Sequence, residues 1–364
     1  MVTRSLFILS LLHLPLLILL VLTACLWGQA SHNAVLAYIS STSECNCLYA
    51  LSLPHGIRLY VSDRIAPSGG IAWSRDGRLA FIADHGNGDS LYVWDGGTPI
   101  NVAPERAFVS SPAWSADGRL AFLQTYDDSG QIFLWDGQQL INVSGNSRMD
   151  GPPVWSADGR LAFRSSRTGR PDIFVWDRGT LTNISQSPAF DISPAWSIDG
   201  RLAFASDRDR NFEIYVWDGR TLTNISRSPN DEESPVWSAD GRLAFTRRVD
   251  SETEIVVWDG TGVTLIAQDV GSESRLAWSA DGRLAYLSNE NGIIHSYVWD
   301  SSSIRRVSAA MTSASAPAWN ADGKLAFRSY FDGSYEIFVW DGAALTNVTH
   351  SADDELAPVW WTPP

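Results

Sequence analysis

Short apolar runs separated by polar turns recur along this chain with a fixed period. One series of tryptophans has a spacing of 41 residues and comprises Trp73, Trp114, Trp155, Trp196, Trp237, Trp278, Trp319 and Trp360. A second series has the same spacing of 41 residues and comprises Trp94, Trp135, Trp176, Trp217, Trp258, Trp299 and Trp340. Because no insertion interrupts the register, the pattern predicts one structural unit repeated in tandem.

Each unit contains four short apolar segments, as the unit around Trp196 illustrates. The segment "SPAWS" is followed by the turn Asp199-Gly200 and by "RLAFAS", and a polar connection leads to "FEIYVWD", the turn Asp218-Gly219 and "TLTNIS". Asp-Gly between apolar runs is a strong hairpin signal, because glycine adopts positive φ without steric cost. Both faces of "IYVW" are apolar, which indicates a strand covered on both sides. The pattern therefore predicts four-stranded antiparallel sheets that pack against copies of themselves.

The two ends of the repeat region together form one further unit. Residues 36–62 match the last three segments of a unit but lack the first, which occurs at the other end of the chain as "APVWW". Seven complete units plus this assembled one predict an all-β, eight-bladed β-propeller with four antiparallel strands per blade. The ring would close by pairing the C-terminal strand with N-terminal strands, which leaves no exposed end blade.

The repeat motif resembles that of a known family. The segments "PVWSADGRLAFRS", "DIFVWD" and "LTNIS" are similar to the WD40-like repeat of the TolB type (PD40), which occurs in bacterial cell-envelope proteins. The resemblance extends over residues 34–360 and implies a β-propeller. TolB itself differs, since its propeller has six blades and follows an α/β domain. An eight-bladed ring is also similar to the propeller of prolyl-oligopeptidase-like peptidases, where it accompanies an α/β-hydrolase domain.

The first thirty residues differ from the repeats. Arg4 precedes an apolar run over residues 6–22, which is the layout of an export signal. The segment Leu22-Thr23-Ala24-Cys25 resembles a bacterial lipobox, which implies cleavage before Cys25 and lipidation of that residue. Cleavage after Gly28-Gln29-Ala30 and an uncleaved membrane span are the alternatives. We predict a lipoprotein-type signal over 1–24, a tether over 25–33 and one propeller domain over 34–364. The location would be extracytoplasmic, anchored to the cell membrane or secreted.

The charge of the chain narrows the choice of partner. Its 364 residues carry a formal net charge of -14 at pH 7. This charge disfavours binding to nucleic acid, whose phosphates would be repelled. We therefore predict a monomer that binds an envelope protein or a basic peptide, contacts the membrane through its lipid anchor, and uses no cofactor.

The connection that leads into the first strand of a unit is acidic in most units. Five residues before the repeat tryptophan lie Asp150, Asp191, Glu232, Glu273 and Glu355, and Asp231 and Asp354 precede two of them. The first strand of a propeller blade lines the centre of the ring. We therefore predict that these carboxylates form an acidic ring at one mouth of a central channel, which would favour a basic peptide, a metal ion or another cation. Our prediction is that they bind the basic partner. The structural alternative is that each carboxylate organises its turn by accepting hydrogen bonds from backbone amides.

Two further charged positions of the repeat favour structural interpretations. A second acidic set precedes the third strand and is predicted to form solvated strand ends: Asp172, Glu213, Glu254 and Glu336. The arginines that follow the Asp-Gly turns are expected to pair locally with carboxylates: Arg78, Arg119, Arg160, Arg201, Arg242 and Arg283.

Two cysteines lie close together in "SECNCLY". In an oxidising compartment Cys45 and Cys47 could form a disulfide, whereas a metal site would need further ligands, and His55 is the only candidate in that region. We predict a structural role for this pair and no metal site.

Signs of catalysis are weak in the sequence. The histidines fall at different phases of the repeat and show no metal-ligand spacing. An active site needs one asymmetric set of residues, which a strict repeat does not favour. We therefore predict a binding scaffold that is not an enzyme. The alternative is a hydrolase that cleaves a glycan or peptide at the acidic mouth. A third hypothesis is a catalytically silent propeller that presents peptides to a separate enzyme.

Overall fold

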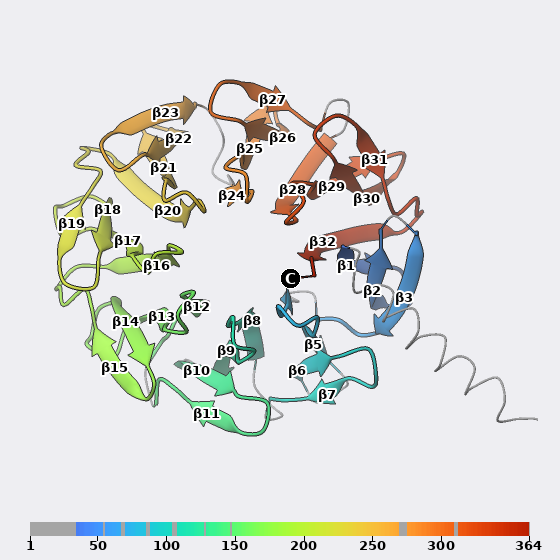
Figure 1. The fold of residues 1–364 in the computed structure, drawn as a ribbon, viewed down its shortest axis with the longest axis horizontal. Coiled ribbons are helices and arrows are strands. Elements are labelled where there is room, and N and C mark those ends of the chain that lie inside the picture. The colour runs from blue at the N-terminus through green and yellow to red at the C-terminus, as the bar shows by residue number, and fades with distance from the viewer. Residues whose placement is uncertain are drawn as a thin grey trace, which may run out of the picture.

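The fold is a ring of β-sheets. The computed structural model describes residues 34–363 except 54, 67–69, 85–87, 104–107, 127–128, 146–147, 269–274 and 309–311. The elements of this part of the chain are all β-strands, and none of its residues forms a helix long and apolar enough to cross a membrane. Eight four-stranded antiparallel sheets surround one axis, which confirms the predicted eight-bladed propeller (Figure 1). The predicted export signal, tether and Cys25 lie outside the described residues.

Seven blades consist of consecutive strands, with the first strand nearest the axis (Figure 1). Blade 1 comprises β4 (Ile71–Trp73), β5 (Leu79–Asp84), β6 (Asp89–Trp94) and β7 (Ile100–Asn101). Blade 2 comprises β8 (Phe108–Trp114), β9 (Leu120–Tyr126), β10 (Ser129–Trp135) and β11 (Leu140–Asn142). Blade 3 comprises β12 (Val154–Trp155), β13 (Leu161–Ser165), β14 (Asp172–Asp177) and β15 (Thr180–Asn183). Blade 4 comprises β16 (Asp191–Trp196), β17 (Leu202–Ser206), β18 (Glu213–Trp217) and β19 (Leu222–Asn224).

The remaining consecutive blades follow the same order. Blade 5 comprises β20 (Asp231–Trp237), β21 (Leu243–Val249), β22 (Glu252–Trp258) and β23 (Val263–Ala267). Blade 6 comprises β24 (Ala277–Trp278), β25 (Leu284–Glu290), β26 (Ile293–Trp299) and β27 (Ile304–Arg306). Blade 7 comprises β28 (Thr312–Trp319), β29 (Leu325–Phe331), β30 (Ser334–Trp340) and β31 (Leu345–Asn347).

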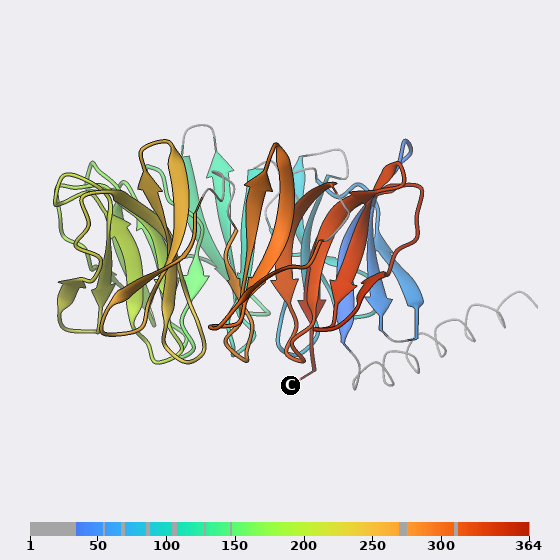
Figure 2. The ribbon, with the colours of Figure 1, turned by 90° about the horizontal axis from the view of Figure 1, so that it is seen from above.

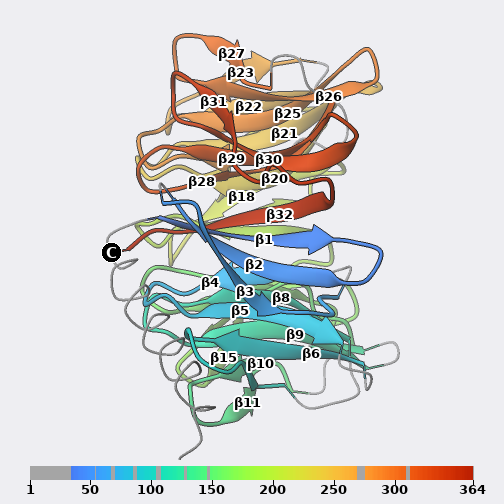
Figure 3. The same cartoon turned by 90° about the vertical axis from the view of Figure 1, so that its right-hand side faces the viewer.

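Blade 8 joins the two ends of the chain. It comprises β1 (Val35–Ser41), β2 (Asn46–Ser52), β3 (Ile57–Ser62) and β32 (Asp354–Trp361), in the order β3-β2-β1-β32. Strand β32 lies beside β1 and pairs with it in an antiparallel register that places Leu36 opposite Trp360 (Figure 3). The predicted closure of the ring by the C-terminal strand is therefore confirmed.

The middle strands of each blade are covered on both faces, as the sequence pattern predicted. In β18, Ile214 and Val216 belong to a buried cluster with Phe245 of blade 5. The intervening Tyr215 belongs to a different cluster, which contains Ile173 of blade 3. Alternate residues of one strand therefore pack against the two neighbouring blades.

Seven tryptophans of the first series, all but Trp196, join their blade to the one before it through an indole hydrogen bond. The indole Nε1 of Trp237 donates to the carbonyl oxygen of Ala195 in blade 4 over 3.1 Å. The guanidinium of Arg201 lies 4.4 Å from the centre of the Trp237 ring, and its Nε donates to Asp199 over 3.0 Å. The other arginines of this position also form an ion pair with the aspartate two residues earlier, so the predicted local pairing is confirmed. The repeated motif thus serves packing and closure.

The ring has two faces with different connections. Because the strands alternate in direction, the Asp-Gly turns lie on one face, which we call the lower face; the C-terminus also lies there (Figure 2). The segments that lead into the first strands, and the turns between second and third strands, lie on the opposite face. We call these the lead-in segments and the upper face. The predicted carboxylates with described positions, Asp150, Asp191, Asp231, Glu232, Asp354 and Glu355, belong to the upper face.

Candidate binding site on the upper face

Four of the predicted carboxylates are buried inside the ring. Asp150, Asp191, Glu232 and Glu355 occupy equivalent positions of their blades, and each is at most 1% exposed. They pair with the second strand of the same blade, and Asp191 lies opposite Ser206, for example. The sequence predicted an open ring of carboxylates, whereas the structure places these four groups between adjacent blades. A carboxylate in such a position does not present its charge to a large partner.

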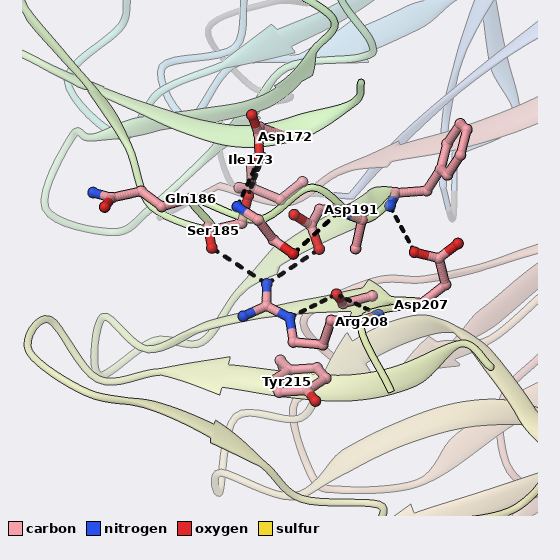
Figure 4. Close-up of polar contacts among 12 residues, drawn as sticks. Asp172, Ile173, Ser185, Gln186, Asp191, Asp207, Arg208 and Tyr215 are labelled. Carbon is pink, nitrogen blue, oxygen red and sulfur yellow. Dashed lines mark hydrogen bonds and ion pairs between the residues drawn. The ribbon is translucent and has the colours of Figure 1, made fainter. Parts of the chain in front are cut away.

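Asp191 shows the arrangement most completely (Figure 4). Its Oδ1 lies 3.2 Å from Nη2 of Arg208, whose Nε donates to Ser206 Oγ over 2.8 Å. The Arg208 guanidinium also lies 4.6 Å from the centre of the Tyr215 ring. Burial raises the pKa of Asp191, and hydrogen bonds from Ser206 and Ser185 together with the Arg208 charge partly offset this effect. The carboxylate is therefore neutralised from within the protein.

Two neighbouring blades also pair their buried acid with an arginine, which lies in the turn after the second strand in blade 3 and within strand β21 in blade 5. In blade 3, Arg167 lies 3.9 Å from Asp150 and donates from Nε to Ser165 Oγ over 2.9 Å. In blade 5, Nε of Arg247 lies 2.8 Å from Glu232 Oε1. Burial raises the pKa of Glu232, although Ser226 and Arg247 lower it. Three consecutive blades thus hold a buried acid with an internal counter-charge.

Glu355 in the closing blade accepts hydrogen bonds from hydroxyl groups. Ser40 Oγ donates to Glu355 Oε1 over 3.2 Å across the β1–β32 seam. Burial raises the pKa of Glu355 to about 7, and the charge of Glu336 contributes in the same direction. The positive charge of Arg58 and a hydrogen bond from Ser351 act against this shift. Both protonation states of Glu355 are consequently populated near neutral pH.

Backbone contacts at the same positions fix the lead-in segments. The amide of Asp191 donates to the carbonyl oxygen of Pro171 over 2.8 Å, and that of Glu232 donates to Phe212 over 2.6 Å. Each contact joins the lead-in segment of one blade to the turn of the blade before it. The buried carboxylates and these amides therefore hold the upper-face segments in place.

The two aspartates that precede buried glutamates lie nearer the solvent. Asp231 is half-buried and its Oδ1 accepts the amide of Phe212 over 2.9 Å. Asp354 is exposed and its Oδ1 accepts the amide of Tyr335 over 2.9 Å. These contacts match the structural alternative, in which a carboxylate organises its turn. Glu273 lies outside the described residues.

The second acidic set differs from its prediction. Asp172, Glu213 and Glu336 are 3%, 6% and 4% exposed, so they are buried and the expectation of solvated strand ends is wrong for them. Glu254 is half-buried. The outer strand covers these carboxylates: Asp172 accepts hydrogen bonds of 3.0 Å from Ser185 Oγ and Asn183 Nδ2. The repeated Asn and Ser of "TNIS" are the sequence signal that could have shown this pairing.

Exposed apolar residues occupy the lead-in segments of three successive blades. Phe108, Met149 and Phe190 directly precede Val109, Asp150 and Asp191, and they are 74%, 42% and 42% exposed. We call these three side chains the apolar arc. Asp231 and Asp354 occupy the same repeat position in blades 5 and 8. Sequence reasoning missed the arc, although the 41-residue spacing of these three residues was the signal for it.

The upper face also carries a small pocket and a disulfide. A pocket of about 90 Å³ in blade 5 is lined by Asp231, Glu233, Ser234, Thr246, Arg247, Arg248 and Thr253. Ligand sites for drug-sized molecules are several times larger, on the order of 300–1,000 Å³. Among the residues with described positions, no group of three or more His, Cys, Asp or Glu side chains is arranged to hold a metal ion. A disulfide joins Cys45 and Cys47 next to the turn between β1 and β2.

Comparisons with known proteins support the fold. The family model described as the TolB beta propeller domain matches residues 75–275. The β-propeller domain of the trilobed protease from Pyrococcus furiosus is 14% identical, with a TM-score of 0.54 over 75% of this chain and 92% of that chain. Dipeptidyl peptidase 4 from Porphyromonas gingivalis is 15% identical, with a TM-score of 0.58 over 79% of this chain and 54% of that enzyme.

A third solved structure, TolB from Acinetobacter baumannii, is 19% identical, with a TM-score of 0.46 over 76% of this chain and 79% of that chain. A comparison with curated protein sequences found no match. At these identities the trilobed protease domain and the dipeptidyl peptidase show a shared propeller fold, and their activities remain properties of those proteins.

Proposed function

Since this chain belongs to the TolB-type β-propeller family, we propose that it is a binding scaffold of the cell envelope whose upper face holds a protein or peptide partner. The observation that carries this proposal is the apolar arc of Phe108, Met149 and Phe190. Large apolar side chains at one repeat position in adjacent blades form a surface that gains free energy when a partner covers it.

Two of the three lead-in segments that carry the arc are prepared for binding because the buried Asp150 and Asp191 hold them. A surface that is already ordered loses less conformational entropy when it binds. The aspartates at the same repeat position in blades 5 and 8, Asp231 and Asp354, add negative charge outside the arc. The partner that fits these features is a peptide segment with apolar side chains next to basic ones.

Replacing the apolar arc with alanine tests this proposal. The triple variant Phe108→Ala, Met149→Ala and Phe190→Ala is expected to lower the yield of crosslinked partner in intact membranes by at least about tenfold, because burial of each large side chain contributes roughly 1.5–3 kcal/mol. The matched control replaces three exposed isoleucines elsewhere, Ile100, Ile198 and Ile304, which are 54%, 68% and 46% exposed.

The outcomes separate the competing hypotheses. Equal capture by the triple variant and the wild-type protein would contradict binding at the arc. Cleavage of the captured peptide by the purified full chain, lost in single carboxylate variants, would support the hydrolase alternative instead.

We also propose that a lipid on Cys25 anchors the protein to the membrane outside the cytoplasm. A metabolically incorporated fatty-acid label is expected on the wild-type protein and absent from the Cys25→Ala variant. The control is Cys45→Ser, which removes a different cysteine and should keep the label. A labelled Cys25→Ala protein that still partitions with lipid would contradict the anchor.

A further inference from the structure

We propose that Cys45 and Cys47 form a thiol–disulfide exchange site that oxidises a dithiol. This activity is separate from partner binding at the apolar arc. The two sulfurs are bonded to each other at the upper face of blade 8, and the bond spans a sequence separation of 2.

The hairpin that carries the disulfide is already held by hydrogen bonds. The amide of Thr42 donates to the carbonyl oxygen of Cys45 over 2.9 Å, and Ser40 lies opposite Cys47 in the β1–β2 ladder. A disulfide stabilises a fold mainly by closing a loop in the unfolded chain, and the effect is smallest for the shortest loops. A disulfide between residues 45 and 47 therefore contributes little to the stability of the fold, which favours a chemical role for it.

The two sulfurs differ in access. Cys45 is half-buried, whereas Cys47 is only 6% exposed. Exchange begins when a thiolate attacks the sulfur that it can reach, so the incoming thiolate attacks Cys45 Sγ. The hydroxyl Oγ1 of Thr42 lies 4.0 Å from that sulfur and can donate to a thiolate formed there.

A buried acid lies in the same row of side chains as Cys47. Ser40 is opposite Cys47 in one ladder and opposite Glu355 in the other, so the three side chains point to the same face of the sheet. Directly opposed residues have Cβ atoms about 4.5–5.5 Å apart. Ser40 Oγ donates to Glu355 Oε1 over 3.2 Å, which connects the hydroxyl between them to the acid.

Glu355 is suited to exchange a proton near neutral pH because burial raises its pKa to about 7. The charged and titratable groups that face it come from three strands. The charge of Arg58 in β3 lowers the pKa of Glu355, and the charge of Glu336 in β30 raises it. Burial and the charge of Glu355 in turn raise the pKa of Tyr38 in β1. Glu355 is therefore a positioning residue, which acts on Cys47 through the Ser40 hydroxyl.

Oxidation of the dithiol proceeds through a mixed disulfide with Cys45. The first thiolate of the dithiol bonds to Cys45 Sγ, the Cys45–Cys47 bond breaks, and Cys47 leaves as a thiolate. The Ser40 hydroxyl then turns toward Cys47, donates its proton to that sulfur and receives a proton from protonated Glu355. The second thiol of the substrate, as its thiolate, attacks the substrate sulfur bonded to Cys45 and releases Cys45, which takes a proton from solvent. The substrate loses two electrons and two protons and becomes a disulfide, while Cys45 and Cys47 become thiols and Glu355 regains its proton from solvent.

Trapping the mixed disulfide tests which sulfur is attacked. Both variants are made in the full chain with Cys25→Ala: Cys47→Ser keeps only the Cys45 thiol, and Cys45→Ser keeps only the Cys47 thiol. The Cys47→Ser variant is expected to form a mixed disulfide with oxidised glutathione at least about tenfold faster, because Cys47 is buried. Equal rates for the two variants, or no mixed disulfide in either, would overturn the proposal.

The pH profile of reduction by dithiothreitol tests the proton path. In the same Cys25→Ala chain, the rate of disulfide reduction is divided by the concentration of dithiothreitol thiolate, and this ratio is expected to change near pH 7. The Glu355→Gln variant should be reduced at least about fivefold more slowly below that pH, and its profile should show no inflection. The matched control is Glu232→Gln, the same substitution at the equivalent position of blade 5, which should keep the wild-type profile. An unchanged profile in Glu355→Gln would remove Glu355 from the mechanism.

Discussion

Replacing Arg208 with alanine is expected to lower the free energy of unfolding by about 3–5 kcal/mol, because it leaves a buried carboxylate without its counter-charge. Asp191 is 0% exposed and has its ion pair with Arg208 at 3.2 Å. The variant also loses the hydrogen bond to Ser206 and the contact of the guanidinium with the Tyr215 ring. Denaturant unfolding at pH 7, followed by tryptophan fluorescence, measures the change.

A second arginine provides the control for Arg208. The side chain of Arg178 is 91% exposed and lies 3.9 Å from Asp177, so Arg178→Ala should change the free energy of unfolding by less than about 1 kcal/mol. The Asp191→Asn substitution in the Arg208→Ala background should recover part of the loss, since it removes the unpaired charge. Equal stability of Arg208→Ala and Arg178→Ala would show that the buried pair does not hold the lead-in segment.

Replacing Glu355 with glutamine is expected to stabilise the protein at pH 8 and to leave its stability nearly unchanged at pH 4. The folded state raises the pKa of Glu355 from 4.5 to about 7, so folding favours the protonated acid. The resulting stability is fully present below pH 4.5 and is lost as the pH rises through about 7. Each pKa unit corresponds to about 1.4 kcal/mol. Between pH 4 and pH 8 the free energy of unfolding of the wild-type protein therefore falls by roughly 3 kcal/mol through this group, and that of the glutamine variant does not.

Unfolding curves of both proteins between pH 4 and pH 8 measure this difference. The control is Glu44→Gln on the exposed turn next to the disulfide, which should follow the wild-type curve at every pH. A stability difference between Glu355→Gln and the wild-type protein that is the same at pH 4 and pH 8 would contradict a buried titrating acid at the seam.

The fold could be predicted from the sequence because the repeat itself encodes it. The unbroken 41-residue register aligned each strand with its counterparts, and "APVWW" around Trp360 supplied the strand that the N-terminal unit lacks. Apolar residues on both faces of "IYVW" required a neighbour on each side. The ring follows from these local patterns, since each blade packs against the blades next to it.

The state of the carboxylates could not be predicted from the same pattern. Spacing placed Asp191 at the start of a first strand, but its counter-charge comes from Arg208 in a turn whose residues vary between blades. Burial of Asp172 depends on Asn183 and Ser185, which the next strand brings alongside. Exposure is a property of such contacts across strands and blades, and a repeat position alone does not determine it.

The arc shows what variation between blades adds to a repeat. Phe108, Met149 and Phe190 occupy a position where blades 5 and 8 carry aspartate, and the buried acid that follows two of them fixes the backbone in place. The repeat therefore builds a nearly uniform ring of blades, and differences between blades at single positions decide where the upper face is apolar and where it is acidic.

Site-specific photo-crosslinking shows which face of the ring binds the partner. A photoreactive phenylalanine analogue placed at Phe190 on the upper face is compared in intact membranes with the same analogue placed at Ile198, which is 68% exposed on the lower face. We predict that position 190 yields one crosslinked partner, attached through a segment that combines apolar and basic residues, and that position 198 does not yield it. Crosslinking of the same partners from both positions, or of none from position 190, would contradict a binding site on the upper face.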